Sequence, residues 1–314
     1  MSALFIFLFV GQRYFFLLYC NKVKNFYFVL IHCRRKVKMS IDFRVRPPIA
    51  SYRNAEFYNN IADVSQRAAR FNAKISPCAA TFSMEALIRE MDECGISRAV
   101  VPIRKGCGGN NEDLLFLLKN WSSRFIGLAG IAPFMGMEQA FNELRQYVID
   151  GPCAGIALEP AFDPEPWHVD DERVFPLYEK CQAEKIPVVF TFGGIFTPKL
   201  DLYSPFAIDT VAKEFPEMQI ALSHGGWPFV TEFCQLAFNR GNIYLAPDMY
   251  MLNAPGSADY IAAANGILYD RMIFASAAPI ISIKDAERHY KTCGIKEEFL
   301  PYVMEKNACR FLRL

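Results

Sequence analysis

The sequence predicts an α/β chain folded as a (β/α)8 barrel, the TIM-barrel class. Eight short apolar runs, each followed by a helix-like run, alternate from residue 41 onwards. These runs lack the polar alternation of half-exposed strands, as is typical of parallel strands buried on both faces. The chain has 314 residues, of which 52% are hydrophobic. This length accommodates one barrel of about 250 residues with additional segments.

The first half of the pattern begins with an expected strand at 41–45. A polar, partly helical insertion follows over 51–77. An amphipathic helix is expected over 83–94, because Gly95 is a typical helix-ending residue. The next strands and helices alternate, strand first, over 98–102, 112–121, 125–131, 138–149, 154–158 and 171–184.

The second half repeats the alternation, strand first, over 187–190, 206–215, 219–222, 229–238, 243–245, 258–264, 272–274 and 284–293. Residues 295–314 are expected to pack outside the barrel as terminal helices. The sequence contains no repeats, linkers or low-complexity tracts, so residues 39–314 are expected to form one barrel domain. Catalytic groups in such a barrel lie on loops at the carboxyl ends of the strands.

Residues 1–38 differ from the rest in composition, because they hold seven basic residues and no acidic one. Their apolar runs are interrupted by basic or polar residues, and none approaches the ~18–20 apolar residues that span a bilayer. The barrel pattern begins just after Met39. We therefore expect Met39 to be the native start, residues 1–38 to be a non-native or disordered extension, and the protein to have no membrane partner.

The formal net charge of +1 hides a difference between these two parts. Of the 34 basic residues seven lie before residue 39, which leaves 27 against all 33 acidic residues, a net charge of −6. A mildly acidic body gives no support for nucleic-acid binding. The ten cysteines include no C-x-x-C pair, which is typical of thiols in a reducing compartment, so a cytoplasmic location is expected.

Four segments resemble the metal-binding positions of a known hydrolase family, with most of the ligands replaced. Residues 41–48 have the frame of a His-x-His strand, but Arg44 and Arg46 occupy both histidine positions. Residues 188–194 end a strand with Thr191 where a histidine is expected, and residues 274–279 have Ala277 where an aspartate is expected. Only residues 223–226 keep their histidine, His224.

The chain resembles the amidohydrolase superfamily, in its amidohydrolase-related branch of hydrolases, lactonases, hydratases and decarboxylases. The passage over residues 214–226 and the tail at 307–312, Asn-Ala-Cys-Arg-Phe-Leu, are similar to those of the branch. The resemblance implies a metal-dependent-hydrolase-like barrel with ligands at strand ends one, five, six and eight. Some lactonases of this branch act without a metal ion.

Arg44 and Arg46 are the expected substrate-binding residues. On a strand they share a face with Asp42, which in a barrel is the interior, and a proline pair ends the strand near the mouth. A buried guanidinium needs fixed partners or an anionic ligand, and its planar fork matches a carboxylate. The alternative is that both arginines form ion pairs within the protein, with Asp42 or Glu159.

The same two arginines argue against a metal or another cofactor. They keep a positive field at the barrel mouth, but they cannot coordinate a water molecule and lower its pKa toward about 7 as zinc does. A different ligand set of Glu159, His224 and Asp248 lacks the spacing of a helical metal motif. We therefore expect no metal and no cofactor.

Three titratable residues at strand ends are the expected catalytic groups: His224, Asp248 and Glu159. A histidine near its ordinary pKa of about 6.5 can move a proton at neutral pH, although His224 can also be a retained histidine satisfied by its neighbours. Glu159 is either a general base or the partner of Arg44 or Arg46. Asp248 is either a second acid–base group or a helix cap.

Two further residues complete the expected substrate contacts. Thr191 offers a hydroxyl, and Trp227 offers an aromatic face to a flat substrate, although such rings more commonly pack in a core. Arg104 and Lys105 follow the second expected strand and precede a loop at 106–111. They are expected to be solvated charges rather than anion ligands.

The leading hypothesis is a metal-independent hydrolase that opens a lactone or cleaves a C–C bond in a small carboxylated cyclic or unsaturated compound. Positioning and a fixed electrostatic clamp would replace the metal. One alternative is a decarboxylase, a lyase of the same branch. Another is an inactive barrel that serves as a ligand-binding or partner-binding subunit. The expected partner is a small anionic substrate, and a homodimer is an expectation inherited from the resemblance.

Overall fold

The computed structural model describes residues 4–10, 13–20, 25–29, 40–195 and 198–314, and the chain divides into the units 1–38 and 39–314. The first unit contains an antiparallel sheet of β1 (Leu4–Val10), β2 (Arg13–Cys20) and β3 (Asn25–Val29), paired in that order. Met39 lies outside the described residues, so the expected start of the native chain stays a prediction. No helix in the described ranges is both long and apolar enough to cross a membrane.

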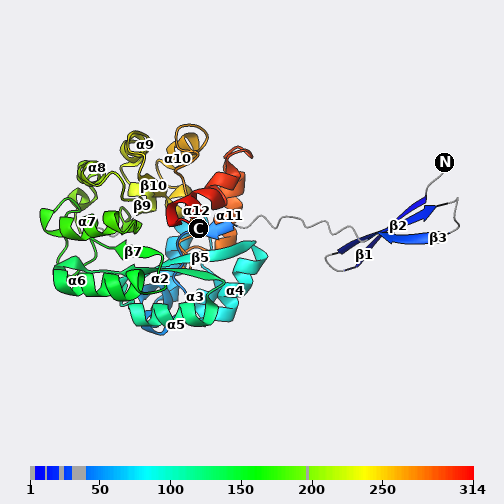
Figure 1. Ribbon diagram of the computed structural model, residues 1–314, viewed down its shortest axis with the longest axis horizontal. Coiled ribbons are helices and arrows are strands. Elements are labelled where there is room, and N and C mark those ends of the chain that lie inside the picture. The colour runs from blue at the N-terminus through cyan, green and yellow to red at the C-terminus, as the bar shows by residue number, and fades with distance from the viewer. Residues whose placement is uncertain (1–3, 11–12, 21–24, 30–39, 196–197) are drawn as a thin grey trace. The chain divides into compact units, whose positions relative to one another are not determined.

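The second unit is built on seven parallel strands that neighbour one another in chain order. They curl into a barrel surrounded by helices (Figure 1). The strands are β4 (Ser40–Asp42), β5 (Ile96–Pro102), β6 (Phe125–Gly130), β7 (Gly155–Leu158), β8 (Val188–Thr191), β9 (Ile220–Ser223) and β10 (Ile243–Ala246). The predicted barrel is confirmed.

The expected eighth strand closes the barrel through isolated bridges instead of a continuous ladder. Met272 bridges Leu245 next to β10, and Ala278 bridges Val45 beyond β4. Ala277 has a φ of +65°, outside the extended region, so the chain cannot run as a regular strand through this segment. The barrel therefore closes, but the eighth strand is only a pair of bridges.

Helices connect the strands much as the sequence predicts. The insertion after β4 contains α1 (Glu56–Asn59), α2 (Ile61–Arg70) and α3 (Pro77–Thr81). The remaining helices are α4 (Met84–Glu93), α5 (Asn111–Trp121), α6 (Met137–Leu144), α7 (Phe175–Ala183), α8 (Pro205–Glu214), α9 (Val230–Asn239), α10 (Ser257–Ala264), α11 (Ile283–Thr292) and α12 (Asn307–Leu312). Side chains of the N-cap residues Ser83, Asn110 and Ser282 accept backbone N–H bonds at the starts of α4, α5 and α11.

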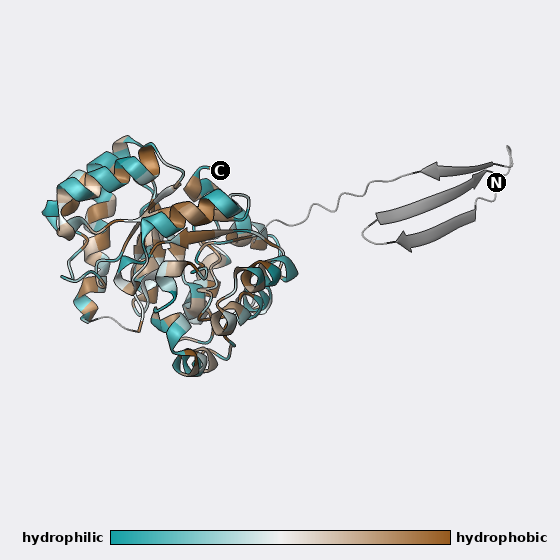
Figure 2. Cartoon of the chain, turned by 90° about the horizontal axis from the view of Figure 1, so that it is seen from below, coloured by the Kyte–Doolittle hydropathy of each residue, from teal (hydrophilic) through white to brown (hydrophobic). Residues whose placement is uncertain are grey.

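Two apolar clusters hold the barrel together. The outer cluster lies between strands and helices, and Figure 2 shows the apolar colour on the strands and on one side of the helices. The inner cluster takes alternate residues of the strands, such as Val100, Ala157 and Ala221. Phe311 of α12 also belongs to it and packs edge to face on Phe43, with ring centres 5.4 Å apart. The expectation that residues 295–314 pack wholly outside is therefore wrong, because the end of the chain packs into the inner core.

A one-residue bulge follows β4 and sets the direction of both arginines. The backbone N–H of Phe43 donates to Phe274 O of the closing segment (3.0 Å), whereas that of Val45 donates to Val100 O of β5 (2.9 Å). In a regular strand these two residues would bond to the same neighbour. Phe43 accordingly lies in the inner cluster and Val45 in the outer one, so Arg44 and Arg46 turn toward the barrel mouth.

Asp42 supports this bulge. Its Oδ1 accepts the backbone N–H of Arg44 at 3.2 Å and that of Ser276 at 2.9 Å. The prediction that Asp42 shares a face with Arg44 and Arg46 is wrong, because the extra residue reverses the alternation between them. Burial raises the pKa of Asp42 to about 7, although hydrogen bonds from Ser276 oppose the shift.

Candidate active site

The strand ends at the barrel mouth carry an unusual set of backbone conformations. His224 after β9, Asp248 after β10 and Ala277 in the closing segment have φ values of +68°, +46° and +65°. Left-handed conformations are unfavourable for residues with a side chain and tend to occur at functional sites. Gly225 and Gly226 continue the turn with φ of +62° and +83°. This end of the barrel is therefore the candidate active site.

Arg44, His224 and Asp248 form one buried cluster. Arg44 Nη1 donates to Asp248 Oδ2 at 2.7 Å, and neither side chain is exposed. The same nitrogen lies 2.8 Å from His224 Nε2 and 2.9 Å from Nδ1. His224 Nδ1 also lies 3.1 Å from Asp248 Oδ1. Arg44 therefore forms an internal ion pair, but with Asp248 and not with Asp42 or Glu159, the partners expected from the sequence.

The partners of His224 determine its tautomer. A carboxylate can only accept, so Nδ1 donates to Asp248, and a guanidinium can only donate, so Nε2 accepts from Arg44. Burial and then the Arg44 charge lower the pKa of His224 to about 3, although Asp248 opposes the shift. Of the two roles left open for His224, these contacts favour a retained histidine satisfied by its neighbours over one that titrates near its ordinary pKa. It is neutral at pH 7, and both ring nitrogens are engaged.

Asp248 is the anion of this cluster. Burial alone would raise its pKa, but the contacts with His224 and Arg44 hold the pKa below its ordinary value. Its Oδ1 also accepts the backbone N–H of Met249 at 2.6 Å. The carboxylate is therefore ionised and fully occupied, which leaves it poorly placed to receive a proton from a substrate.

Arg104 and Glu159 form a second buried ion pair. Arg104 Nε donates to Glu159 Oε1, and Glu159 Oε2 accepts the backbone N–H of Gly106 at 3.1 Å. Burial would lower the pKa of Arg104, but the neighbouring Glu159 carboxylate raises it above its ordinary value. Glu159 is thus the partner of Arg104, not of Arg44 or Arg46 as expected.

The expectation that Arg104 and Lys105 are solvated charges is also wrong. Arg104 is 8% exposed and its guanidinium carbon lies 4.8 Å from the centre of the Phe162 ring. Lys105 Nζ lies 2.7 Å from both carboxylate oxygens of Glu143. No local sequence pattern indicates these pairings, because each joins side chains from different strand–helix units.

Within the described residues, Arg46 is the buried cation of the mouth that forms no ion pair. Its Nη1 donates to Ala277 O at 2.9 Å, and its guanidinium carbon lies 5.5 Å from the centre of the Phe57 ring. Burial, together with the charges of Arg44 and Arg104, lowers the pKa of Arg46 to about 9. The guanidinium remains protonated at pH 7 but lacks a compensating anion.

Several guanidinium N–H groups at the mouth are buried without a hydrogen-bond partner in the described part of the chain. They are Arg44 Nε and Nη2, Arg46 Nε, and Arg104 Nη2. A buried donor without a partner costs about 1–3 kcal/mol, and more when it is charged. Such a concentration of open donors indicates a site for an anionic ligand.

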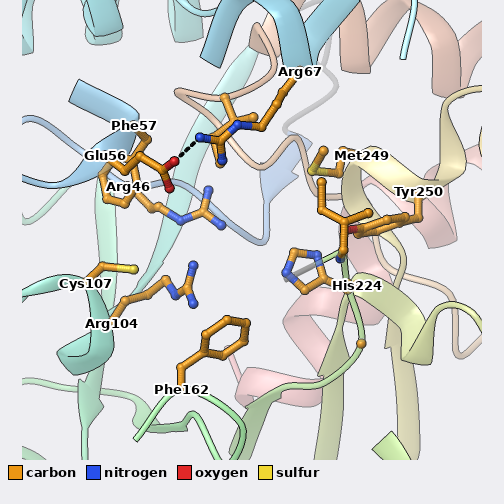
Figure 3. A pocket seen from close by; sticks show the side chains of 14 residues that line it. Arg46, Glu56, Phe57, Arg67, Arg104, Cys107, Phe162, His224, Met249 and Tyr250 are labelled. Atoms are coloured by element: carbon orange, nitrogen blue, oxygen red, sulfur yellow. Dashed lines mark hydrogen bonds and ion pairs between the residues drawn. The ribbon is translucent and has the colours of Figure 1, made fainter. Parts of the chain in front are cut away.

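A cavity of about 80 Å³ lies beside these groups (Figure 3). Arg46 and Arg104 point into it from one side, and His224 lies opposite them. Its apolar walls include Phe57, Phe162, Met249, Tyr250 and Ile280. Arg44, Glu159 and Asp248 are not among the lining residues. The lining also includes Arg67 and the Glu56 carboxylate, so the cavity presents three arginines, one carboxylate and several rings to a ligand.

Two expected substrate contacts lie behind the cavity wall. Thr191, 4% exposed, ends β8 beside Ser223 and does not line the cavity. Trp227 stacks on Tyr250 with ring centres 4.9 Å apart, and its Nε1 donates to Pro255 O at 3.0 Å. Trp227 thus supports Tyr250, which itself lines the cavity.

The sequence prediction missed several lining residues: Glu56, Phe57, Arg67, Cys107 and Phe162. Glu56, Phe57 and Arg67 belong to the insertion after β4, whose polar, arginine-bearing composition was its only signal. The Glu56 carboxylate forms an ion pair with Arg67. Long-range folding of this insertion over the mouth has no local signature in the sequence.

The donor set at the mouth does not fit a divalent metal ion. Arg44 and Arg46 put guanidinium groups where the resembled family has histidines, and Thr191 and Ala277 replace two further ligands. A zinc site needs about three protein ligands, and the described residues contain no suitable group of three or more His, Cys, Asp or Glu side chains. The retained His224 contacts a guanidinium instead.

Comparisons with known proteins place this geometry in a family. The amidohydrolase family model matches residues 76–314. An uncharacterized TIM-barrel protein, Bb4693 from Bordetella bronchiseptica, is 34% identical with a TM-score of 0.82, over 88% of this chain and 98% of that chain. No curated protein matches.

More distant structures share the fold. A 2,6-dihydroxybenzoate decarboxylase from Rhizobium is 14% identical, with a TM-score of 0.64 over 88% of this chain and 98% of that chain. A 4-oxalomesaconate hydratase from Rhodopseudomonas palustris is 19% identical, with a TM-score of 0.57 over 88% and 96%. The family model over residues 76–314, together with the 34% identical relative, shows that the chain belongs to the amidohydrolase family, in its amidohydrolase-related branch.

Proposed function

We propose that this protein is a hydrolase that acts, without a bound metal ion, on a small cyclic or unsaturated compound carrying one carboxylate. The observation that carries the proposal is the pair of buried guanidinium groups of Arg46 and Arg104, which line one cavity and keep open N–H donors. Arginine binds carboxylates and oxyanions through such donors. Membership of the amidohydrolase-related branch supports an enzymatic role.

The charge balance supports a monoanion. Asp248 compensates Arg44, Glu159 compensates Arg104, and Glu56 and Asp63 compensate Arg67, whereas Arg46 forms no ion pair within the described residues. One positive charge therefore remains at the mouth for a ligand. A carboxylate that bridges Arg46 and Arg104 would neutralise this charge and complete donors that are open without it.

The walls support a compact, flat substrate. Phe57 and Phe162 lie beside the two guanidinium groups, and Tyr250 faces them with Trp227 stacked behind it. Aromatic walls favour ring-shaped or unsaturated ligands through dispersion and ring stacking. The volume of about 80 Å³ admits only a small molecule.

Fixed charge would provide the catalysis. Water adds to the substrate carbonyl carbon and loses a proton to solvent, while the C=O π electrons move to the carbonyl oxygen. The C=O bond then re-forms as the ring C–O bond breaks, and the leaving oxygen takes up a proton, which gives an acid and an alcohol. Donors arranged in advance around that oxygen stabilise the charge as it develops. Within the described lining, Glu56 contributes the carboxylate, and we assign it the positioning of the attacking water.

Decarboxylation fits this site less well. Loss of CO2 leaves a carbanion that needs a proton, but His224 is neutral with both nitrogens engaged and Asp248 is ionised. A second candidate is a non-catalytic barrel that binds a carboxylate, possible because His224, Asp248 and Glu159 are all held in internal contacts. Turnover distinguishes it from the hydrolase.

The test uses purified protein whose metal content is measured by elemental analysis. Hydrolysis of a panel of carboxylated lactones and unsaturated cyclic acids is followed, with thermal shifts for the same compounds. We expect turnover of at least one compound after removal of metal, and loss of turnover in Arg46→Gln. Binding without turnover would favour the non-catalytic barrel, and absence of both would refute the proposal.

A further inference from the structure

Cys107 lies in a loop that is held rigidly at the cavity. The loop leaves β5 through η2 (Lys105–Cys107), and the backbone N–H of Arg104 donates to the Tyr52 hydroxyl at 2.9 Å. Gly106 fits only because it has no side chain, since a Cβ there would lie 2.6 Å from Phe162 O. The N–H of Cys107 donates to Arg104 O at 3.1 Å. The backbone that carries the thiol is therefore held by these contacts.

This position faces the anion site. Cys107 lines the cavity together with Arg46 and Arg104, and Figure 3 shows its Sγ pointing toward the space between the two guanidinium groups. Arg46 is 1% exposed and Arg104 8% exposed. Each keeps a buried guanidinium nitrogen for which no partner is recorded among the described residues, so the thiol does not stand alone beside an apolar wall.

We propose that Cys107 is a covalent capture site for small electrophilic carboxylates. A carboxylate held by Arg46 and Arg104 would place an adjacent electrophilic carbon next to Sγ, and proximity would raise the reaction rate over that of a freely diffusing thiol reagent. This inference rests on the proposed function, because it uses the same anion site. It adds the chemical class of ligand that modifies the site.

The reaction with iodoacetate defines the step. The Cys107 sulfur attacks the methylene carbon, an S–C bond forms as the C–I bond breaks, iodide leaves with the bonding electron pair, and the thiol proton passes to solvent. Iodoacetamide reacts in the same way but carries no negative charge. The two reagents therefore differ in whether the arginines can hold them.

The experiment measures alkylation rates at individual cysteines of the full chain by peptide mass spectrometry. Cys309, partly buried on α12, is the internal control because it is remote from the cavity lining. We expect the ratio of the iodoacetate rate to the iodoacetamide rate to be at least about tenfold higher at Cys107 than at Cys309. Benzoate should slow alkylation of Cys107, and benzamide should not.

A matched pair of variants tests the cause. Arg46→Gln should lower the iodoacetate rate at Cys107 about tenfold while the iodoacetamide rate changes less than about twofold, and Arg46→Lys should be intermediate. If Arg46→Gln does not fold, the wild-type ratio and benzoate protection still decide the question. Cys107→Ser should lose the adduct and retain benzoate binding.

The outcomes separate this inference from the proposed function. Equal reagent ratios at Cys107 and Cys309, with benzoate still stabilising the protein, would overturn the role of Cys107 and leave the anion site intact. Equal ratios with no stabilisation by any carboxylate would overturn both. A Cys107 that does not react in the folded protein would also overturn the inference.

Discussion

Arg44 Nη1 lies 2.8 Å from His224 Nε2 and donates a hydrogen bond to the one histidine retained at the expected ligand positions. The guanidinium is a fixed cation that also pairs with Asp248. It therefore occupies the acceptor nitrogen of the imidazole and suppresses its protonation. The arginine expected to bind substrate instead belongs to the internal framework, and Arg46 and Arg104 face the cavity.

The depressed pKa of His224 predicts how stability depends on pH. The folded state keeps the ring neutral down to about pH 3, whereas the unfolded chain protonates it below about 6.5. The contribution is present above pH 6.5 and is lost as the pH falls. Between pH 7 and pH 5, wild type should lose on the order of 2 kcal/mol more unfolding free energy than His224→Gln. Urea unfolding at both values measures the difference, and parallel losses would contradict it.

The pH dependence of catalysis should also reflect a neutral His224 ring. Because His224 does not titrate near neutrality in the folded state, kcat/KM for any substrate identified should show no inflection from this residue between pH 5 and pH 8. A pH–rate profile of wild type provides the measurement. An inflection near pH 6.5 that disappears in His224→Gln would show that the ring is accessible to protons during turnover.

Asp42 predicts a pH dependence of opposite sign. Its folded pKa of about 7 lies above the ordinary aspartate value of 3.8, so its stabilising contribution is present below pH 3.8 and is lost as the pH rises through 7. Asp42→Asn keeps an acceptor for the amides of Arg44 and Ser276 but cannot ionise. The free energy of unfolding of the variant should rise relative to that of wild type from pH 4 to pH 8. The gain should be at most about a few kcal/mol.

Urea unfolding of Asp42→Asn and wild type across this range provides the measurement. Asp92→Asn is a suitable control, because the Asp92 side chain is 62% exposed. The control should show no comparable trend with pH. A relative stability of Asp42→Asn that stays flat or falls with rising pH would mean that Asp42 is ionised throughout.

Removal of the Asp248 carboxylate should strongly lower the free energy of unfolding. Asp248→Asn leaves the buried Arg44 without its anion, and breaking a buried ion pair costs about 3–5 kcal/mol. Lys180→Ala, which breaks the exposed pair with Glu184, should cost less than about 1 kcal/mol. Denaturant midpoints at pH 7 compare the two, and equal losses would argue against a buried charged pair at the mouth.

Arg46 should lower the stability of the ligand-free protein while it provides the binding of carboxylates. Its lowered pKa reflects an uncompensated buried charge, so Arg46→Gln should leave the stability of the ligand-free protein unchanged or higher. The same substitution should abolish the thermal shift produced by benzoate or related carboxylates. Arg53→Gln, at an exposed position, is the control and should affect neither quantity. A large loss of ligand-free stability in Arg46→Gln would show that Arg46 has a structural role.

The sequence by itself determined the barrel, its strand order and which strand ends carry His224 and Asp248 to its mouth. These follow from local signals: apolar runs buried on both faces, capping side chains such as Ser83, and the stop at Gly95 with φ of +68°. His224 and Asp248 could be assigned to the mouth because both follow a strand directly.

Only the tertiary structure decided which charges pair and which face the ligand. The bulge after Phe43 reverses the strand alternation that the sequence pattern assumed, and Asp42 stabilises the bulge through amides of Arg44 and Ser276. Arg44 and Asp248 are 204 residues apart in the chain. Side-chain periodicity reports only on neighbours a few residues apart, so pairings between distant strand ends are determined by barrel closure and by the free energy of burying charge.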